Sequence, residues 1–300
     1  MLYDIKNSAT DCIKNELILS KQLRVSIVRF DQIHPVISGN KLFKLYYFLQ
    51  DHQAGSTLVT FGGAYSNHLV ATAFACKEKG IPCIGIVRGE KPASLSKTLI
   101  ECINYGMQLK FLDRALYNKK DTEYFINEIK NQYGQNISIV PEGGYHPMGA
   151  KGASLMMDAI CKKTTHICCA SGTATTFAGL LLKKQPHQQV VAIPVLKGMH
   201  DFNERLRYLT GRTFDDTDLF ISDAYHFGGY AKKTPQLIAF MNQLYQDFNI
   251  PTDFVYTGKM MFAVMDLIEK GFFPAGSNIV CLHTGGLQGN NSLPENTLTF

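Results

Sequence analysis

The stretch Thr57-Leu58-Val59-Thr60-Phe61-Gly62-Gly63-Ala64-Tyr65-Ser66-Asn67-His68 decides the fold of this chain. Its apolar first part, residues 57–61, predicts a buried strand that ends at the glycine pair. An alanine-rich segment with helical spacing follows at 69–79 and ends at Gly80, and residues 82–87 are strand-like again. A strand, a helix and a strand of these lengths predict a βαβ unit, in which the strands are parallel and the crossover is right-handed.

The same alternation continues to the end of the chain, so we expect an α/β protein throughout. The polar stretch 113–135 predicts a solvated helix with flanking loops. No linker rich in Pro, Gly or Ser and no internal repeat is present, so composition shows no domain boundary. Further strands are expected at 107–112, 137–140, 166–169, 190–194 and 278–282, and further helices at 148–162, 177–183 and 259–270.

Composition and charge describe an ordinary globular protein and exclude several classes of function. The 300 residues are 45% hydrophobic and 18% charged, and the net charge of +5 is spread along the chain. No basic run with interleaved aromatics indicates nucleic-acid binding, and no apolar stretch is long enough to span a membrane. Eight cysteines without a CxxC spacing favour reduced thiols and the cytoplasm, and nine scattered histidines predict no metal site.

The segment Ser38-Gly39-Asn40-Lys41-Leu42-Phe43-Lys44 contains the most informative residue, Lys41. A lysine in a turn is usually a solvated surface charge. Here, however, Gly39 and Asn40 tolerate unusual backbone angles, while Leu42 and Leu45 supply an apolar face at helical spacing. A lysine at the buried start of a helix is desolvated, which lowers its pKa and frees the amine as a nucleophile.

Three glycine-containing turns follow predicted strands, where ligands collect in open parallel sheets. They contain Gly62-Gly63, Gly172-Thr173 and Thr284-Gly285-Gly286. The turn at 172–176 leads into a helix whose N–H groups could hold a phosphate, although such a turn is more often only a cap. An amine, the Ser66-Asn67 pair and this turn are the parts needed to hold pyridoxal phosphate.

Four ordered motifs give the chain a family resemblance from about residue 24 to about residue 290. The sequence resembles the 1-aminocyclopropane-1-carboxylate deaminase/D-cysteine desulfhydrase family of fold type II pyridoxal-phosphate enzymes. The motifs are Gly39-Asn40-Lys41-Leu42-x-Lys44-Leu45, Ser66-Asn67-His68, Val255-Tyr256-Thr257-Gly258-Lys259 and His283-Thr284-Gly285-Gly286.

The resemblance implies a two-domain, doubly wound α/β enzyme of the tryptophan synthase β-like kind, with pyridoxal 5'-phosphate in the interdomain cleft. The large domain would comprise 1–43 and 151–300, with a smaller domain inserted at 44–150, and the enzyme would be a homodimer. Lys41 would be the Schiff-base lysine, and Ser66 would bind the substrate carboxylate or assist proton transfer, with Tyr256 and Tyr230 also in the active site. The cofactor would be held by Lys44, Asn67, Gly172, Thr173, Ala174, Thr175, Thr176 and Thr284.

Position 257 separates the branches of this family. The true deaminases resemble one another in a glutamate after the tyrosine and a leucine in the His-x-Gly-Gly turn, whereas this chain has Thr257 and Thr284. A carboxylate beside the ring nitrogen deepens the electron sink that cyclopropane opening needs, so the threonines favour the desulfhydrase branch. The chain departs from the family pattern at Phe43, Tyr65 and Gln288, where Tyr65 and Gln288 are expected to alter the substrate pocket.

The expected activity is α,β-elimination from a small amino acid, D-cysteine or a relative, giving a 2-oxo acid and ammonia. Three alternatives stay open: 1-aminocyclopropane-1-carboxylate deamination, β-replacement of the cysteine-synthase kind, and a non-catalytic protein that binds pyridoxal phosphate. The departures at Phe43 and Tyr65 motivate the last of these, and a different loop in place of Tyr65-Ser66-Asn67-His68 would be expected for β-replacement.

Overall fold

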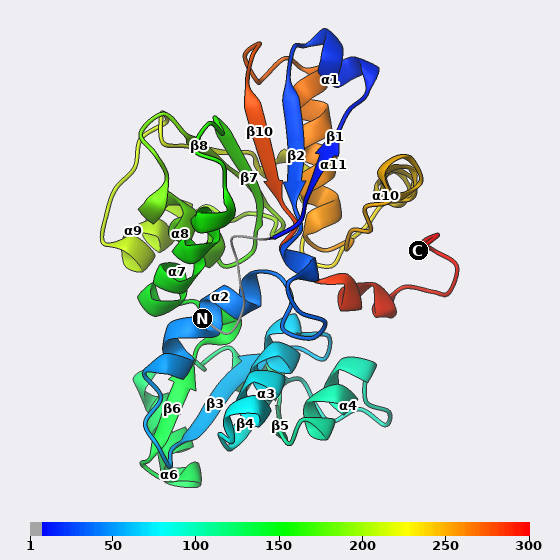
Figure 1. Ribbon diagram of the computed structural model, residues 1–300. Helices are drawn as coiled ribbons and strands as arrows, with labels where there is room; N and C mark the ends of the chain where they lie inside the picture. Colours follow the sequence, from blue (N-terminus) through cyan, green and yellow to red (C-terminus); the bar gives the residue numbers. More distant parts are fainter. Residues whose placement is uncertain (1–7) are drawn as a thin grey trace.

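The computed structural model describes residues 8–300, which form two separate β-sheets (Figure 1). The larger sheet has the strand order β1-β2-β10-β7-β8-β9. Its neighbouring strands are parallel except for β1, which pairs antiparallel with β2 at the edge. These strands are β1 (Thr10–Ile13), β2 (Arg24–Val28), β7 (His166–Ser171), β8 (Gln189–Pro194), β9 (Leu219–Ile221) and β10 (Asn278–Leu282).

The smaller sheet is parallel and has the order β5-β4-β3-β6. The predicted βαβ unit is confirmed, because β3 and β4 pair in parallel on either side of helix α3 (Asn67–Lys79). The helix begins after the Ser66 cap and ends at Gly80, whose left-handed conformation is one that glycine adopts without strain. The strands are β3 (Thr57–Gly62), β4 (Cys83–Arg88), β5 (Gln108–Leu112) and β6 (Ile137–Val140).

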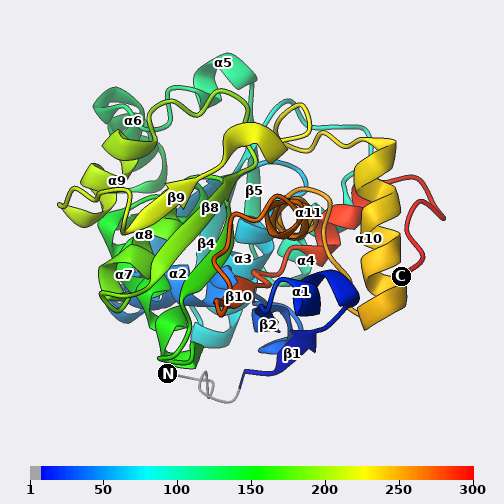
Figure 2. The ribbon, with the colours of Figure 1, turned by 90° about the horizontal axis from the view of Figure 1, so that it is seen from above.

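The larger sheet is buried on both faces, which explains why its strands are continuous apolar runs. Along β7, Ile167 and Cys169 pack on one face, and Cys168 and Ala170 on the other. Helices α7 (Pro147–Ala153), α8 (Thr175–Lys183) and α9 (Phe202–Thr210) cover the first face. Helices α1 (Glu16–Ser20), α10 (Pro235–Phe248) and α11 (Thr257–Glu269) cover the second (Figure 2). The doubly wound α/β class is therefore confirmed.

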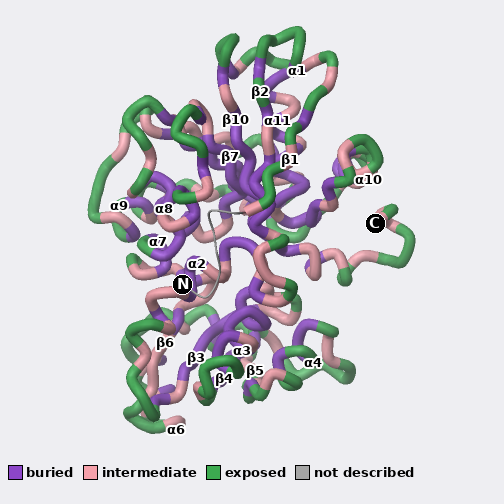
Figure 3. Tube along the Cα trace, viewed as in Figure 1, coloured by how far each residue is buried: buried purple, intermediate pink, exposed green. Residues whose placement is uncertain are grey.

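The smaller sheet also has two buried faces. The strands β3, β4, β7, β8 and β10 are buried along most of their length (Figure 3). Leu58 faces α3 and α4 (Lys97–Asn104), whereas Val59 and Phe61 face α6 (Glu123–Tyr133). The stretch 113–135 was predicted as one helix and contains two, because α5 (Arg114–Tyr117) precedes α6.

The predicted helix at 148–162 is wrong in its second half. The α-helix α7 ends at Ala153, and a 3-10 helix continues from Ser154 to Ala159. The glycines of α7 allow close backbone contact, since a Cβ on Gly152 would lie 2.1 Å from the carbonyl oxygen of Phe43. The sequence pattern made no prediction for β1, α1, β2, α4, α9, β9 and α10.

Helix α2 (Asn40–Gln50) joins the cores of the two sheets. Phe43 packs in a core of the larger sheet, while Leu45 and Phe48 pack in a core of the smaller one. The domain boundaries expected at 43/44 and 150/151 thus fall inside α2 and α7, and they stay a prediction.

The start of α2 depends on a glycine. Gly39 has φ 65° and ψ −147°, a region that only glycine adopts readily. A Cβ at this position would lie 1.8 Å from the carbonyl oxygen of Thr284, in the turn after β10. The backbone N–H of Asn40 donates to that same oxygen over 3.2 Å. The two turns therefore touch, and this contact fixes where α2 begins.

We predict that Gly39→Ala lowers the free energy of unfolding by about 2 kcal/mol or more, through backbone strain and a clash with Thr284. Gly80→Ala is the control, because Gly80 has φ 64° with open space around it, and it should cost about 1 kcal/mol. Denaturant unfolding of both variants measures the difference. If both variants lose the same free energy of unfolding, the close contact between Gly39 and Thr284 does not contribute to stability.

Candidate active site

A cavity of about 650 Å³ is lined by loops at the carboxyl ends of both sheets. Each sheet reverses its strand order once, between β7 and β10 in the larger sheet and between β3 and β6 in the smaller. Ligands bind at such switch points in open α/β sheets. All of the predicted site residues line this one cavity: Lys41, Lys44, Ser66, Asn67, Gly172, Thr173, Ala174, Thr175, Thr176, Tyr230, Tyr256 and Thr284.

Lys41 is the second residue of α2, and its ammonium is linked to the turn before α8. Lys41 Nζ donates to Asn40 Oδ1 over 2.8 Å, and Asn40 Nδ2 donates to Thr176 Oγ1 over 2.8 Å. Burial lowers the pKa of Lys41 to about 8, although the carboxylate of Asp253 opposes this effect. The sequence expectation of a desolvated lysine at a helix start is therefore met in the structure.

Lys44 lies one turn further along α2 and is buried. Burial lowers its pKa well below the usual range, and the positive charge of Lys41 lowers it further. The protonated forms of these two amines repel each other. A bound dianion would stabilise both of them, so this end of the cavity is suited to a phosphate.

The turn between β7 and α8 offers backbone donors. Ala174 is left-handed (φ 64°) and precedes the first residue of α8, Thr175. The hydroxyls of Thr173 and Thr175 bond to each other over 2.8 Å, so they are already ordered. Gly172 lies against the ring of Tyr256, where a Cβ would approach within 3.2 Å. The first N–H groups of a helix have no partner within that helix, so the start of α8 is suited to bind an anion such as phosphate.

Ser66 and Asn67 begin α3 on the opposite wall of the cavity. The Ser66 hydroxyl accepts from the Leu69 N–H over 3.3 Å and so caps the start of α3. Its own proton is left to donate elsewhere. Asn67 Oδ1 is buried without a hydrogen-bond partner among residues 8–300, which marks it as a group aimed at a ligand.

Asp253 is a cavity residue that the sequence reasoning missed. Its two carboxylate oxygens accept from the N–H groups of Val255, Tyr256 and Thr257 and from the Thr257 hydroxyl. Burial raises the pKa of Asp253, and these hydrogen bonds oppose the rise. An aspartate just before the Tyr-Thr-Gly-Lys segment, at the start of a helix, is the signal that could have found it.

The interpretation of Thr257 needs correction. Thr257 does not line the cavity, because its hydroxyl is fully buried against Asp253. The residue type at 257 was expected to decide whether a carboxylate faces the cofactor ring. In the structure, Asp253 brings a carboxylate to the cavity wall instead, and Thr284 lines the wall as expected.

His68, from the Ser66-Asn67-His68 motif, also lines the cavity. Burial lowers its pKa to about 3, and the charges of Lys41 and Lys44 add to this effect. Its Nε2 lies 2.9 Å from the hydroxyl of Thr60, which itself donates to a backbone carbonyl, so Nε2 is the protonated nitrogen. His68 is thus a neutral side chain below the two lysines and cannot repel a cation or a cofactor.

Tyr230 and Tyr256 form a pair at the mouth of the cavity, with ring centroids 6.1 Å apart at 72°. Burial raises the pKa of both phenols, and each influences the other. Both therefore stay protonated at neutral pH.

Two of the departures from the family pattern lie outside the cavity. Phe43 is buried in the core, where its ring meets that of Phe30 at 5.2 Å, and Gln288 is not among the lining residues. The expectation that Gln288 alters the pocket is therefore wrong, and Phe43 gives no reason to expect lost turnover. Tyr65 does line the cavity and is half exposed.

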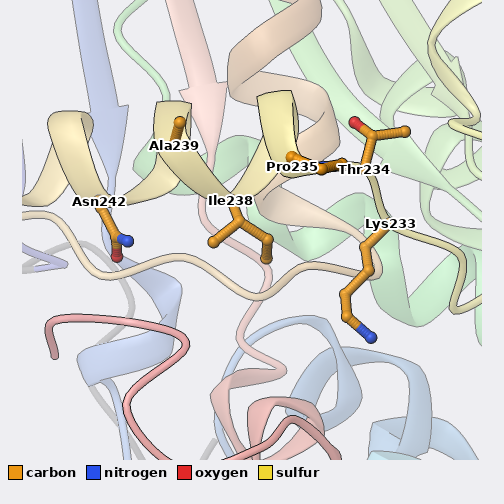
Figure 4. A pocket seen from close by; sticks show the side chains of 6 residues that line it. All are labelled: Lys233, Thr234, Pro235, Ile238, Ala239 and Asn242. Carbon is orange, nitrogen blue, oxygen red and sulfur yellow. The ribbon is translucent and has the colours of Figure 1, made fainter.

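A second hollow runs along α10 (Figure 4) and shares no residue with the first. It contains one charged side chain. Its lining residues are Lys233, Thr234, Pro235, Ile238, Ala239 and Asn242. In residues 8–300, no helix is long and apolar enough to cross a membrane.

The chain is similar in sequence and structure to several known proteins. A putative 1-aminocyclopropane-1-carboxylate deaminase of Pyrococcus abyssi is 28% identical over 90% of this chain and 87% of its own length. A D-cysteine desulfhydrase of Klebsiella pneumoniae is 26% identical over 87% of this chain and 86% of its own. The crystal structure of an ACC deaminase homologue superposes with a TM-score of 0.76 at 26% identity, covering 96% of this chain and 92% of the other.

The residues at the cavity fit the cofactor that these similarities imply. The α8 turn and Lys44 would hold a phosphate, the Lys41 amine is buried and unpaired with any carboxylate at bonding distance in the described chain, and Asn67 has a free buried oxygen. The family described as "Pyridoxal-phosphate dependent enzyme" matches residues 17–285. Since this match covers most of the chain, the protein belongs to that family of pyridoxal-phosphate dependent enzymes.

Proposed function

We propose that this enzyme is a deaminating lyase of the D-cysteine desulfhydrase kind. It would eliminate the β-substituent of a small amino acid and release a 2-oxo acid and ammonia. The observation that supports this proposal is that the Lys41 amine, with a pKa of about 8, lines one cavity with the turn at 172–176 and with Ser66 and Asn67. The names of the relatives, D-cysteine desulfhydrase and putative 1-aminocyclopropane-1-carboxylate deaminase, support the reaction class.

Lys41 would be the base that takes the Cα proton. The cofactor, when bound, supplies an electron sink for the negative charge left at Cα. An amine with a pKa near neutrality exists in useful amounts in both the free and the protonated form, which suits it to accept and return a proton. Asn40 holds the Lys41 amine by its 2.8 Å hydrogen bond and so limits where that proton can be taken from.

Ser66 would orient the substrate through its carboxylate. Its oxygen already accepts from Leu69 N–H, so its proton is available to a carboxylate in the cavity. The N-terminus of α3 adds the favourable end of a helix dipole at the same place. The substrate Cα would then lie between Ser66 and Lys41.

Tyr230 and Tyr256 would supply a proton to the leaving group, since both phenols stay protonated. The segment that carries Tyr230 is held by Lys259, a fully buried lysine of α11. Lys259 Nζ donates to the carbonyls of His226 and Gly229, each over 2.8 Å. Lys259 would therefore be a positioning residue for Tyr230. This role accounts for the lysine of the Tyr-Thr-Gly-Lys segment, which does not line the cavity.

We also propose that the enzyme is a homodimer of the cytoplasm. The family resemblance supports the dimer, and eight cysteines that are all free thiols support a reducing compartment. Light scattering coupled to gel filtration would measure the dimer mass directly.

Lys41→Ala is expected to lower 2-oxo acid release about a thousandfold or more, because the proposed base is lost and Lys44, the other lysine of the cavity, would be held by the cofactor phosphate. The absorbance of the covalently bound cofactor near the visible edge should disappear as well. Lys91→Ala, an exposed lysine outside the cavity, is the control. An unchanged absorbance spectrum in the Lys41→Ala variant would refute the role of Lys41.

The rate at which cofactor-free protein binds pyridoxal phosphate covalently should depend on pH. Burial lowers the pKa of Lys41 to about 8, so the nucleophilic free amine predominates above that pH and is protonated below it. The rate should rise about tenfold per pH unit from pH 6 and level off above about pH 8. A stopped-flow absorbance profile that keeps rising to pH 10 would show that Lys41 has an ordinary amine pKa.

Lys259→Met should lower kcat about tenfold while leaving cofactor absorbance intact, because the Tyr230 segment loses both of its hydrogen bonds. A double-mutant cycle separates positioning from general damage. Lys259→Met should add little to the loss already caused by Tyr230→Phe, because both act through one phenol. If the two losses multiply, Lys259 does not act through Tyr230.

A further inference from the structure

Two charged side chains line the cavity without a part in the chemistry described above. Arg88 is the last residue of β4, and Glu142 follows β6. Both strands flank β3, the strand that leads to Ser66. Arg88 and Glu142 therefore belong to the wall that would face the substrate, while the phosphate-binding turn belongs to the other sheet.

The two charges differ in whether they are compensated. The Glu142 carboxylate lies 3.4 Å from the ammonium of Lys120, which also pairs with Asp121. The side chain of Arg88 makes no hydrogen bond and no ion pair with any residue in 8–300; it is exposed and lines the cavity. Its guanidinium carries five donors and is always charged at physiological pH.

Arg88 acts close to the leaving-group end of the cavity. The pKa of Tyr230 is raised chiefly by burial, and the positive charge of Arg88 is among the effects that oppose the rise. The carboxylates of Glu142 and Asp253 act on the same phenol with the opposite sign, so Arg88 is the positive charge among the groups that influence Tyr230. Arg88 and Tyr230 line the same cavity, so an anion on the β-substituent of the substrate could contact both.

We propose that Arg88 binds an oxyanion on the β-substituent, so that the substrates are amino acids with a negatively charged leaving group, such as a phosphate or sulfonate. This rests on the elimination reaction proposed above. For serine O-phosphate, the Cα proton passes to Lys41 and the Cβ–O bond breaks with its electron pair leaving on the phosphate. One water is then consumed as the remaining three-carbon unit becomes pyruvate and ammonia, with no change of oxidation state overall.

The test compares serine O-phosphate with O-acetylserine, in both enantiomers, by release of pyruvate from the holoenzyme. In the wild-type enzyme the ratio of kcat/KM, phosphate over acetate, should exceed about ten, and Arg88→Gln should lower that ratio about ten- to a hundredfold, the effect of one bidentate arginine contact. Arg114→Gln removes an exposed arginine outside the cavity and should leave the ratio unchanged. A ratio near one in the wild-type enzyme, or an unaltered ratio in Arg88→Gln, overturns the inference.

The failure of this inference is distinguishable from the failure of the proposed function. If pyruvate forms equally well from both esters, the lyase proposal stands and the proposed role of Arg88 is overturned. If no amino acid yields a 2-oxo acid, the lyase proposal fails, and substrate binding is then followed by the change in cofactor absorbance. Tighter binding of serine O-phosphate than of O-acetylserine, lost in Arg88→Gln, would still support the anion site, whereas equal binding would overturn it.

Discussion

The contact between Gly39 and the Thr284 carbonyl is the constraint on which the active site depends. It joins the turn before α2 to the turn after β10, and only a residue without Cβ allows the approach. Because α2 begins there, Lys41 emerges at the switch point of the larger sheet rather than on the surface. One turn later the same helix enters the core of the smaller sheet through Leu45 and Phe48. A single helix thus carries the reactive amine and ties the two sheets together around it.

Electrostatics divides the cavity into two ends. At one end, Lys41, Lys44 and the start of α8 gather positive charge and backbone donors that suit a phosphate. His68 remains neutral beneath them, so its imidazole adds no repulsion. Elsewhere the cavity is lined by the Tyr230–Tyr256 pair and by Arg88, which in the proposed reaction would contact the leaving group. Asp253 is a buried carboxylate of the same cavity; burial raises its pKa, and the four hydrogen bonds that it accepts oppose this rise.

Much of the fold could be predicted from periodicity because both sheets are buried on two faces. Continuous apolar runs such as 57–61 and 278–282 stand out from their surroundings, and β3 and β10 occur where expected. Elements with weaker hydrophobic patterns were not predicted. The strand β1 has only one buried residue, Ile13, and α9 is polar on average, so neither stands out as an apolar run. The helix predicted at 148–162 is too long, because the α-helix ends at Ala153 and residues 154–159 form a 3-10 helix.

The sequence by itself determined the family, the parallel α/β class and the residue types at the site, because the motifs are contiguous and each follows a strand or begins a helix. Only the tertiary structure decided which of these residues share a cavity and which have other tasks. It placed Thr257 behind Asp253, Phe43 in the core and Lys259 beneath the Tyr230 segment. The physical reason is that burial and partnership arise from contacts between distant segments, such as 39 with 284 and 226–229 with 259, and no local pattern encodes them.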